Sequence, residues 1–571
     1  MLLSLILSCR AASGGIPASA TPSLVTGTVS PSPTPLPPSR AADTATASAT
    51  AGVTASATQP ATPTAAGYRV QVHPEGGLYV GDQVSFEVIG EPPEESQASI
   101  EIAAVEPVSL GPAKFGSFGI ARRSQATFLW AWDTSGLAAG VYTATIRIQG
   151  ATSHTTWDMP LALQPAGERQ AAQWTSVTTE CCVINYITGT ASERDIERLA
   201  AQADAQARSA SRSMEATFSE PLTVTLLSRV LGHGGFASDE ISISYLDRNY
   251  AGDTFSTVLH HEMIHILDAS LGGNYRPSLF VEGLAVYMTG GHFKPEPLRE
   301  RAAALLQIEG GEWYIPIEDL ANDFYASQHE IGYLQGGALI DYMVRRWGWA
   351  AFSAFYRQME TGQDQLPAAV IDAALREHLA LSLGDLEADF LHDLQQQRVS
   401  TAQREDLRLT VIYYDTLRHY QQTLDSSAYF ATAWLLDGRE MRRRGIVADY
   451  LRHPNADENL ALETLLMAAN TQITRGEFAL AEAMLQDVEN VLAAIETGQE
   501  EPFTASWAAS EYLSIVRLLR AAGYEAQQVW ISGDQAEAQV SDASARLLQA
   551  QFQRQGDAWA LVAVGEPTSV K

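Results

Sequence analysis

One stretch of this sequence, residues 10–66, cannot form a packed domain, and it separates a short amino end from a folding body. Of its 57 residues, 47 are Ala, Thr, Pro, Ser or Gly, and only Arg10, Arg40 and Asp43 carry charge. Such a composition buries too little apolar surface to offset the conformational entropy that ordering costs. We therefore expect a disordered tether over residues 10–66. The roughly 500 residues that follow should hold about three or four domains.

The residues before this stretch are apolar and end in a cysteine. They read Met1-Leu-Leu-Ser-Leu-Ile-Leu-Ser-Cys9. Residues 1–9 resemble a bacterial lipoprotein signal, which is cleaved before a cysteine that is then lipidated. The resemblance implies an extracytoplasmic protein anchored to a bacterial membrane through Cys9. The alternative is a plain apolar amino end. No run of 18 or more apolar residues occurs, so no transmembrane helix is expected.

The charge balance excludes one class of partner. The chain has 37 Lys and Arg against 67 Asp and Glu, which gives a formal net charge of −30. A field of this sign repels polyphosphate, so nucleic acid is not an expected partner.

Besides Cys9, the chain has only the adjacent pair Cys181 and Cys182. Neighbouring Cα atoms lie ~3.8 Å apart, closer than the ~4.4–6.8 Å of relaxed disulfides. Two buried thiols are therefore at least as good an expectation as a bridge, and both alternatives stay open.

Residues 67–165 alternate apolar and polar side chains with a period of two. Several short strands in about 100 residues predict a β-sandwich. Within them, Gly136-Leu-Ala-Ala-Gly-Val-Tyr142 resembles bacterial Ig-like modules in which a tyrosine holds the entry of a strand. The resemblance implies a spacer or docking module.

Three further regions follow. Residues 170–400 pass from a helix through strands at 222–227 and 241–245 into a series of helices, which is the order of an α+β domain. Residues 401–500 keep helical periodicity and predict a helical bundle. Residues 501–571 combine one helix with four alternating stretches and predict a small α+β domain with an antiparallel meander.

The most informative motif is His261-Glu262-Met263-Ile264-His265. Histidines four residues apart share one face of a helix, with Cβ atoms ~5–6 Å apart, so both imidazoles can bind one ion at ~2.0–2.1 Å. Glu262 follows the first histidine and can reach a metal-bound water without binding the ion, which suits a general base. The surrounding residues are mostly apolar, as expected of a buried helix.

A hydrolytic metal site also needs a third protein ligand and one open position. Seventeen residues after His265, the segment Pro277-Ser-Leu-Phe-Val-Glu282-Gly-Leu-Ala285 begins a second helix. A charge within such an apolar run usually has a partner, so a ligand is favoured over a surface acid at Glu282.

Together, the two motifs resemble the gluzincin clan of metallopeptidases, in particular the peptidase MA family, over about residues 170–400. The resemblance implies a zincin-type catalytic domain in which His261, His265 and Glu282 bind Zn²⁺ and Glu262 is the catalytic base.

Residues 333–348 resemble a later helix of the same family, which carries a tyrosine facing the site. The resemblance implies that Tyr333 stabilises the oxyanion, with a core tyrosine as the alternative and Tyr325 as the competing candidate. Asp268 either orients a ligand histidine or is a solvated acid at the helix end. Three histidines are expected to be structural: His260, His292 and His329.

The strand at 241–245 precedes the metal-binding helix, where such enzymes pair extended peptide with an edge strand. Aminopeptidases of the clan carry Gly-x-Met-Glu-Asn nearby, whereas this chain has Gly235-Phe-Ala-Ser-Asp239. We therefore predict a membrane-tethered, extracytoplasmic zinc peptidase that acts on peptide or protein, with endopeptidase favoured over aminopeptidase. The alternative is a catalytically silent cell-surface scaffold that binds peptide or protein.

Overall fold

The structure is a computed structural model. It describes residues 64–65, 67–93, 95–118, 123–150, 153–166, 172–228, 234–292, 294–361, 365–425, 438–452 and 454–566. The predicted signal with Cys9 lies outside the described residues, as does the predicted tether up to residue 63. Within the tether range, Thr64–Ala65 form a short strand paired with Tyr68 and Arg69. None of the helices in the described part of the chain is long and apolar enough to span a membrane.

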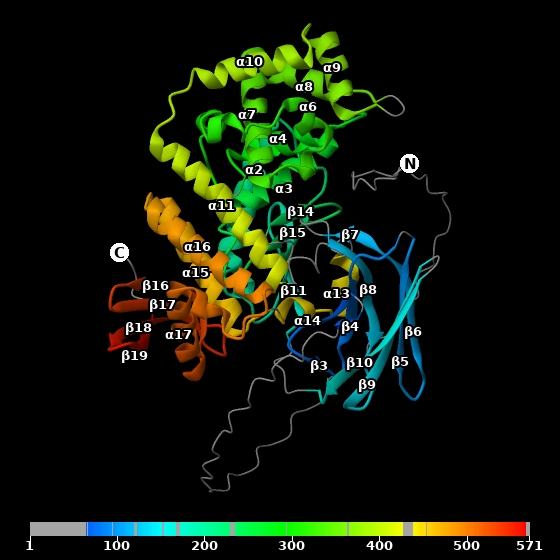
Figure 1. Cartoon of the computed structure of the whole chain (residues 1–571). Helices are drawn as coiled ribbons and strands as arrows, with labels where there is room; N and C mark the ends of the chain where they lie inside the picture. Colours follow the sequence, from blue (N-terminus) through cyan, green and yellow to red (C-terminus); the bar gives the residue numbers. More distant parts are fainter. Residues whose placement is uncertain are drawn as a thin grey trace, which may run out of the picture. The chain divides into compact units, whose positions relative to one another are not determined.

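The first region consists of two five-stranded sheets that share one core (Figure 1). Phe86 of one sheet and Ile146 of the other are fully buried in that core. The Tyr142 hydroxyl donates to the Ala138 carbonyl at 2.8 Å and so ties down the entry of β9. The sheet orders are β1-β2-β4-β8-β7 and β3-β10-β9-β5-β6. The bounds are β1 Thr64–Ala65, β2 Tyr68–His73, β3 Leu78–Tyr79, β4 Gln83–Ile89, β5 Gln97–Ala103, β6 Val108–Lys114, β7 Gly116–Phe118, β8 Arg123–Asp133, β9 Gly140–Gln149 and β10 His154–Gln164.

The second region contains a mixed five-stranded sheet of order β11-β12-β13-β15-β14. Strands β12, β13 and β15 run parallel, whereas β14 returns antiparallel to β15 and forms the outer strand. The edge strand beside the helix that carries the predicted metal ligands is therefore β14. The expectation that residues 241–245 form this edge is wrong, because β14 covers that side of β15. The bounds are β11 Trp174–Thr178, β12 Cys182–Ile187, α1 Ala191–Arg194, α2 Ile196–Ser213, β13 Leu222–Leu227, β14 Gly235–Ala237 and β15 Ile241–Ser244.

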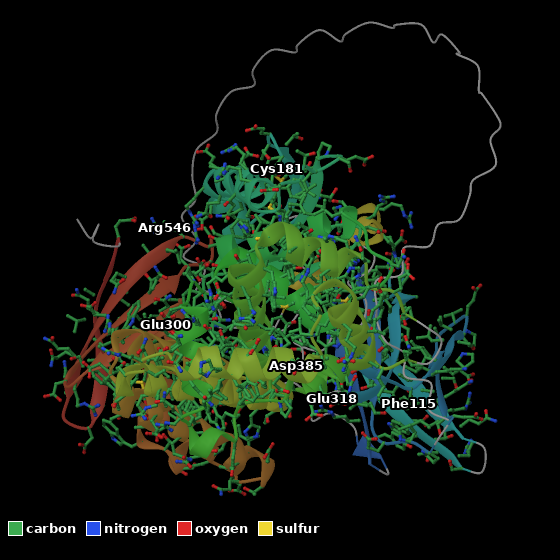
Figure 2. The ribbon with its side chains drawn as sticks, turned by 90° about the horizontal axis from the view of Figure 1, so that it is seen from above. Phe115, Cys181, Glu300, Glu318, Asp385 and Arg546 are labelled. Carbon is green, nitrogen blue, oxygen red and sulfur yellow. A yellow bond between two sulfur atoms is a disulfide. The ribbon has the colours of Figure 1, made fainter. Side chains whose placement is uncertain are left out.

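A disulfide joins Cys181 and Cys182 at the start of β12; Cys181 is labelled in Figure 2. Of the two alternatives left open by the sequence, the structure has the bridge. The turn is held in place by α2, because the Cys181 amide donates to the Asp204 carboxylate at 2.9 Å.

Helices α3 to α10 share one core with this mixed sheet. Ile243 from the sheet and Leu259, Met263 and Phe280 from the helices are fully buried in it. The bounds are α3 Phe255–Ser270, α4 Ser278–Thr289, α5 Leu298–Leu305, α6 Ile317–Asn322, α7 His329–Trp347, α8 Trp349–Arg357, α9 Pro367–His378 and α10 Leu383–Gln395, with short 3-10 turns at Glu309–Gly311 and Phe324–Ala326.

Helices α4 and α7 cross at a contact between glycines. A Cβ added to Gly283 would lie 2.7 Å from the backbone carbon and oxygen of Gly336. Real Cβ atoms essentially never come this close, so only residues without a Cβ allow the crossing. Since Glu282 precedes Gly283 and Tyr333 lies one turn before Gly336, the crossing sets the spacing between the backbones that carry Glu282 and Tyr333.

Helices α11 and α15 to α17 and a four-stranded antiparallel sheet, β16-β17-β18-β19, share a separate core, whereas Met441 of α13 lies in a small cluster with Trp130, Ile187 and Leu227. Leu465 of α15, Val516 of α17 and Val540 of β17 are buried together in it. The bounds are α11 Thr401–Leu424, α13 Gly438–Arg444, α14 Ala448–Leu451, α15 Asp457–Arg475, α16 Phe478–Glu496, α17 Trp507–Ala521, β16 Glu525–Ser532, β17 Gln535–Ser541, β18 Leu547–Gln555 and β19 Ala558–Gly565, with a 3-10 turn at Pro502–Ala505. The broad division into β regions and helical regions therefore agrees with the prediction.

The loop between β15 and α3 is fastened to this carboxyl-terminal core. Arg248 is 1% exposed, and its guanidinium donates to the Glu463 carboxylate of α15 and, at 3.1 Å, to the Ala526 carbonyl of β16. The hydroxyl of Tyr413 on α11 donates to the Tyr250 carbonyl. The carboxyl-terminal helices and the last sheet therefore hold the segment that leads into α3.

Candidate metal centre

Two histidines of helix α3 point to the same place because they are four residues apart and the start of the helix is fixed by a cap. The helix begins after Thr254, whose hydroxyl accepts the Thr257 amide at 3.4 Å. Residues Leu259 and Met263 bury one face in the core. His261 and His265 lie one turn apart on another face, with ring centroids 4.7 Å apart.

Glu282 of α4 completes a cluster of three ligand atoms. The Nε2 atoms of His261 and His265 each lie 3.3 Å from Glu282 Oε2. All three ligand atoms lie within 4.8 Å of one another. The edge of a tetrahedron around Zn²⁺ with bonds of ~2.0–2.1 Å is about 3.4 Å, so these separations fit one shared ion.

The electrostatics of the cluster also suit a cation. Burial alone would lower the pKa of His265, but the Glu282 carboxylate outweighs it and raises this pKa to about 9. The cluster therefore attracts positive charge at neutral pH. A metal ion binds the neutral imidazole and takes the place of this proton.

Glu262 lies beside the cluster and not within it. Its side chain is buried, and its carboxylate accepts the Ala237 amide of β14. A Cβ added to Gly235 would lie 2.8 Å from Glu262 Oε1, so the outer strand passes directly over this carboxylate. Burial raises the pKa of Glu262, and His265 and His261 partly oppose the shift. A carboxylate in this position can accept a proton next to the metal centre.

Tyr325 touches the cluster directly. Its hydroxyl donates to Glu282 Oε1 at 2.7 Å, on the oxygen that does not face the histidines. The side chain is 58% exposed. From the sequence, Tyr325 was only the competitor of Tyr333, because nothing local indicates that the turn at Phe324–Ala326 folds over α4.

Tyr333 is buried beside the cluster. Its ring stacks on His292 with centroids 4.0 Å apart, and it lies 4.4 Å from the ring of His329 and 6.2 Å from that of His261. Burial raises the pKa of Tyr333 well above its ordinary value, so the phenol keeps its proton at neutral pH. A protonated phenol at this place is a hydrogen-bond donor.

Asp268 has neither of the two roles considered for it. It makes no hydrogen bond to His265, whose Nδ1 has no partner among the described residues. The carboxylate is fully buried, so it is not a solvated acid. It accepts Arg276 Nη1 at 2.9 Å and the Tyr356 hydroxyl at 2.9 Å, and it pairs with Arg357 at 2.8 Å. The group therefore joins the end of α3 to the loop after it and to α8.

The three histidines expected to be structural differ from one another. His260 points away from the cluster, and its Nδ1 lies 2.7 Å from Gln206 Oε1 on α2. His292 and His329 instead meet Glu330, and their ligand atoms form a second close group. No local pattern in the sequence indicates this group, since its members come from a loop and from the first turn of α7.

Comparisons with known proteins give little beyond this geometry. No protein-family model matches the chain, and a search of curated proteins finds no match. Among solved structures, the chain is similar to an aminopeptidase N family protein from Idiomarina loihiensis at 11% identity, covering 57% of this chain and 76% of that one, with a TM-score of 0.23. It is also similar to a mutant of Salmonella alpha-2-macroglobulin at 13% identity, covering 89% of this chain and 31% of that one, with a TM-score of 0.12. Likenesses this weak carry no weight, so function is inferred from the side chains.

Proposed function

We propose that this chain is a zinc-dependent peptidase of the gluzincin type. The observation that carries the proposal is the convergence of His261, His265 and Glu282, with Glu262 beside them under the outer strand. Two imidazoles and one carboxylate are the ligands that catalytic zinc sites of this kind use.

In this proposal each residue has a separate task. His261, His265 and Glu282 hold the ion, which supplies a Lewis acid towards a carbonyl and makes water nucleophilic near neutral pH. Glu262 takes a proton from the attacking water and returns it to the departing amine. Tyr333 donates a hydrogen bond to the developing oxyanion.

We place the substrate along β14. In the described part of the chain, β14 pairs only with β15, so its other side can receive an extended peptide as an additional strand. A peptide there would pass over Glu262. The preference for internal bonds rests on the sequence between Gly235 and Asp239 alone, and N-acetylated peptides test it, since an aminopeptidase does not cleave them.

The decisive test is Glu262→Gln. This variant should keep its zinc and its fold while its kcat falls by roughly 10²–10⁴, because an amide cannot accept the proton. The matched control is Glu180→Gln, at a carboxylate whose side chain is 71% exposed and which pairs only with Arg208 among the described residues. If Glu262→Gln cleaved a peptide library at the parental rate, Glu262 would not be the base.

The same measurements separate the peptidase from the silent scaffold. A parental protein that holds zinc and binds peptides, yet cleaves none of the library, would favour the scaffold. His265→Ala should lose the zinc of this centre in either case, since two ligands do not close the site.

We also propose that Cys9 carries a lipid anchor and that the protein is extracytoplasmic. Cys9→Ala should move the protein from the membrane fraction to the soluble fraction. Deleting residues 20–60 should leave it in the membrane fraction, because that stretch serves only as a spacer. A Cys9→Ala variant that stays with the membrane would contradict the anchor.

A further inference from the structure

A second group of metal-binding side chains lies outside the centre described above. It consists of His292, in the loop after α4, and of His329 and Glu330, in the first turn of α7. Their ligand atoms all lie within 4.8 Å of one another. His292 and Glu330 are 8% and 9% exposed, and His329 is half-buried, so the group is enclosed but open on one side.

The distances fit a shared ion better than a strong hydrogen bond. His292 Nδ1 lies 3.5 Å from Glu330 Oε2, and the rings of His292 and His329 have centroids 4.9 Å apart. A good N–H···O bond is ~2.7–3.2 Å long, whereas the edge of a tetrahedron around Zn²⁺ is about 3.4 Å. The first cluster shows nearly the same separation between its histidines and its carboxylate.

The carboxylate of Glu330 is only partly satisfied by hydrogen bonds. Its Oε1 is buried and has no hydrogen-bond partner among the described residues. The charges that act on Glu330 are those of His329, Arg418, Arg301 and Lys294, and none of these groups donates a hydrogen bond to Oε1. Arg301 is itself engaged by Glu296 at 2.6 Å and by Asp406. A carboxylate that is more than nine-tenths buried ordinarily has a cation beside it.

The second group borders the first centre but shares no side chain with it. The Tyr333 ring lies against His292 and His329, and the His292 and His261 rings have centroids 5.9 Å apart. Glu282 serves the first group and Glu330 serves the second. Two ions could therefore be held at the same time.

We propose that His292, His329 and Glu330 form a second Zn²⁺ site next to the first. Two imidazole nitrogens and one carboxylate oxygen match the ligand preference of Zn²⁺, and the half-buried His329 leaves a side from which the ion enters. This site goes beyond the proposed peptidase activity and does not depend on it.

The test is a count of bound zinc on the full chain. Protein stripped with a chelator is reloaded with Zn²⁺, passed through a desalting column and measured by elemental analysis, and Co²⁺ titration followed by absorbance gives the affinity of each site. The parent should hold two equivalents. Glu330→Gln keeps the shape of the side chain and should hold one, with affinity for the second equivalent lowered at least about tenfold. His329→Asn should behave alike, and His261→Ala should lose the other equivalent.

The control variant is His419→Asn. His419 lies between Glu489 at 2.7 Å and Glu496 at 3.0 Å near the surface, so it is where loosely bound zinc would collect. This variant should keep two equivalents. One equivalent of zinc in the parent, or two equivalents in Glu330→Gln, would overturn the second site. A zinc content that falls only in His419→Asn would overturn it as well. Two equivalents in Glu262→Gln with undiminished hydrolysis would instead refute the proposed function and leave this site standing.

Discussion

Replacing Gly283 by alanine tests whether the glycine crossing of α4 and α7 sets the geometry of the metal centre. The added Cβ would lie 2.7 Å from the Gly336 carbonyl carbon and oxygen, where ordinary contacts begin at 3.4 Å. Both clashing atoms belong to the backbone, so no side chain can turn away and the helices must separate. Overpacking of this kind costs about 1–3 kcal/mol, against a gain of about 1 kcal/mol from the helix propensity of alanine.

The displacement should also reach the ion. Glu282 immediately precedes Gly283, and its Oε2 lies 3.3 Å from each histidine of α3. A shift of a few tenths of an ångström in α4 moves this oxygen relative to both nitrogens. We expect Gly283→Ala to lose up to about 2 kcal/mol in urea unfolding and to bind zinc at least about tenfold more weakly in competition with a chelator.

The matched control is Gly384→Ala in α10. A Cβ there would meet only Ser382 Oγ, at an ordinary 3.9 Å. This variant should be neutral or gain up to about 1 kcal/mol and should keep its zinc affinity. If Gly283→Ala were as stable as Gly384→Ala and bound zinc equally tightly, the crossing would not control the centre.

Four other variants test separate parts of the structure. Burial raises the pKa of the Asp253 carboxyl to about 7. The folded chain therefore binds the carboxyl proton more tightly than the unfolded chain does. As a result, the free energy of unfolding falls as pH rises from about 4 to about 7. Asp253→Asn should therefore gain about 1–2 kcal/mol over the parent in urea unfolding at about pH 8 and little at about pH 4. Arg248→Met should lose about 3–5 kcal/mol in the same assay because it leaves Glu463 buried without its cation, and adding Glu463→Gln should recover much of the loss. Tyr333→Phe should lower kcat by roughly a hundredfold at unchanged zinc content, and a parental kcat would move the oxyanion role to Tyr325. Tyr325→Phe should weaken zinc binding by about tenfold in a chelator competition, since it removes the hydrogen bond to Glu282.

The metal centre shows what a sequence can predict about a site. His261 and His265 depend only on local helix geometry, so their spacing is enough to place them on one face. Glu282 was predicted because a charge within an apolar helix needs a partner. The meeting of His292 with Glu330 depends on how a loop and a distant helix start are packed, and neither leaves a periodic pattern.

The fold was likewise predictable from the sequence in some elements and not in others. Alternation of apolar residues predicted short strands over residues 67–165, where the structure has β2 to β10, and an apolar run predicted a strand at 222–227, which are the bounds of β13. The position of β14 outside β15 was not predictable, because a three-residue strand has no measurable period. Periodicity also shows that a face is apolar without showing what covers it. For this reason the sequence did not indicate that the carboxyl-terminal helices and the last sheet share one core.

The fastened loop before α3 has a practical consequence for anyone who divides this protein into fragments. A fragment that stops near residue 400 would keep every ligand of the first metal centre. It would, however, lack Glu463, which pairs with the buried Arg248 guanidinium, and Tyr413, whose hydroxyl donates to the Tyr250 carbonyl. Water would then enter beneath the start of the metal-binding helix, and the fragment should be recovered poor in zinc although its motif is complete. The smallest fragment that we expect to hold the ion therefore extends to the final sheet, because the carboxyl-terminal region supports the start of α3.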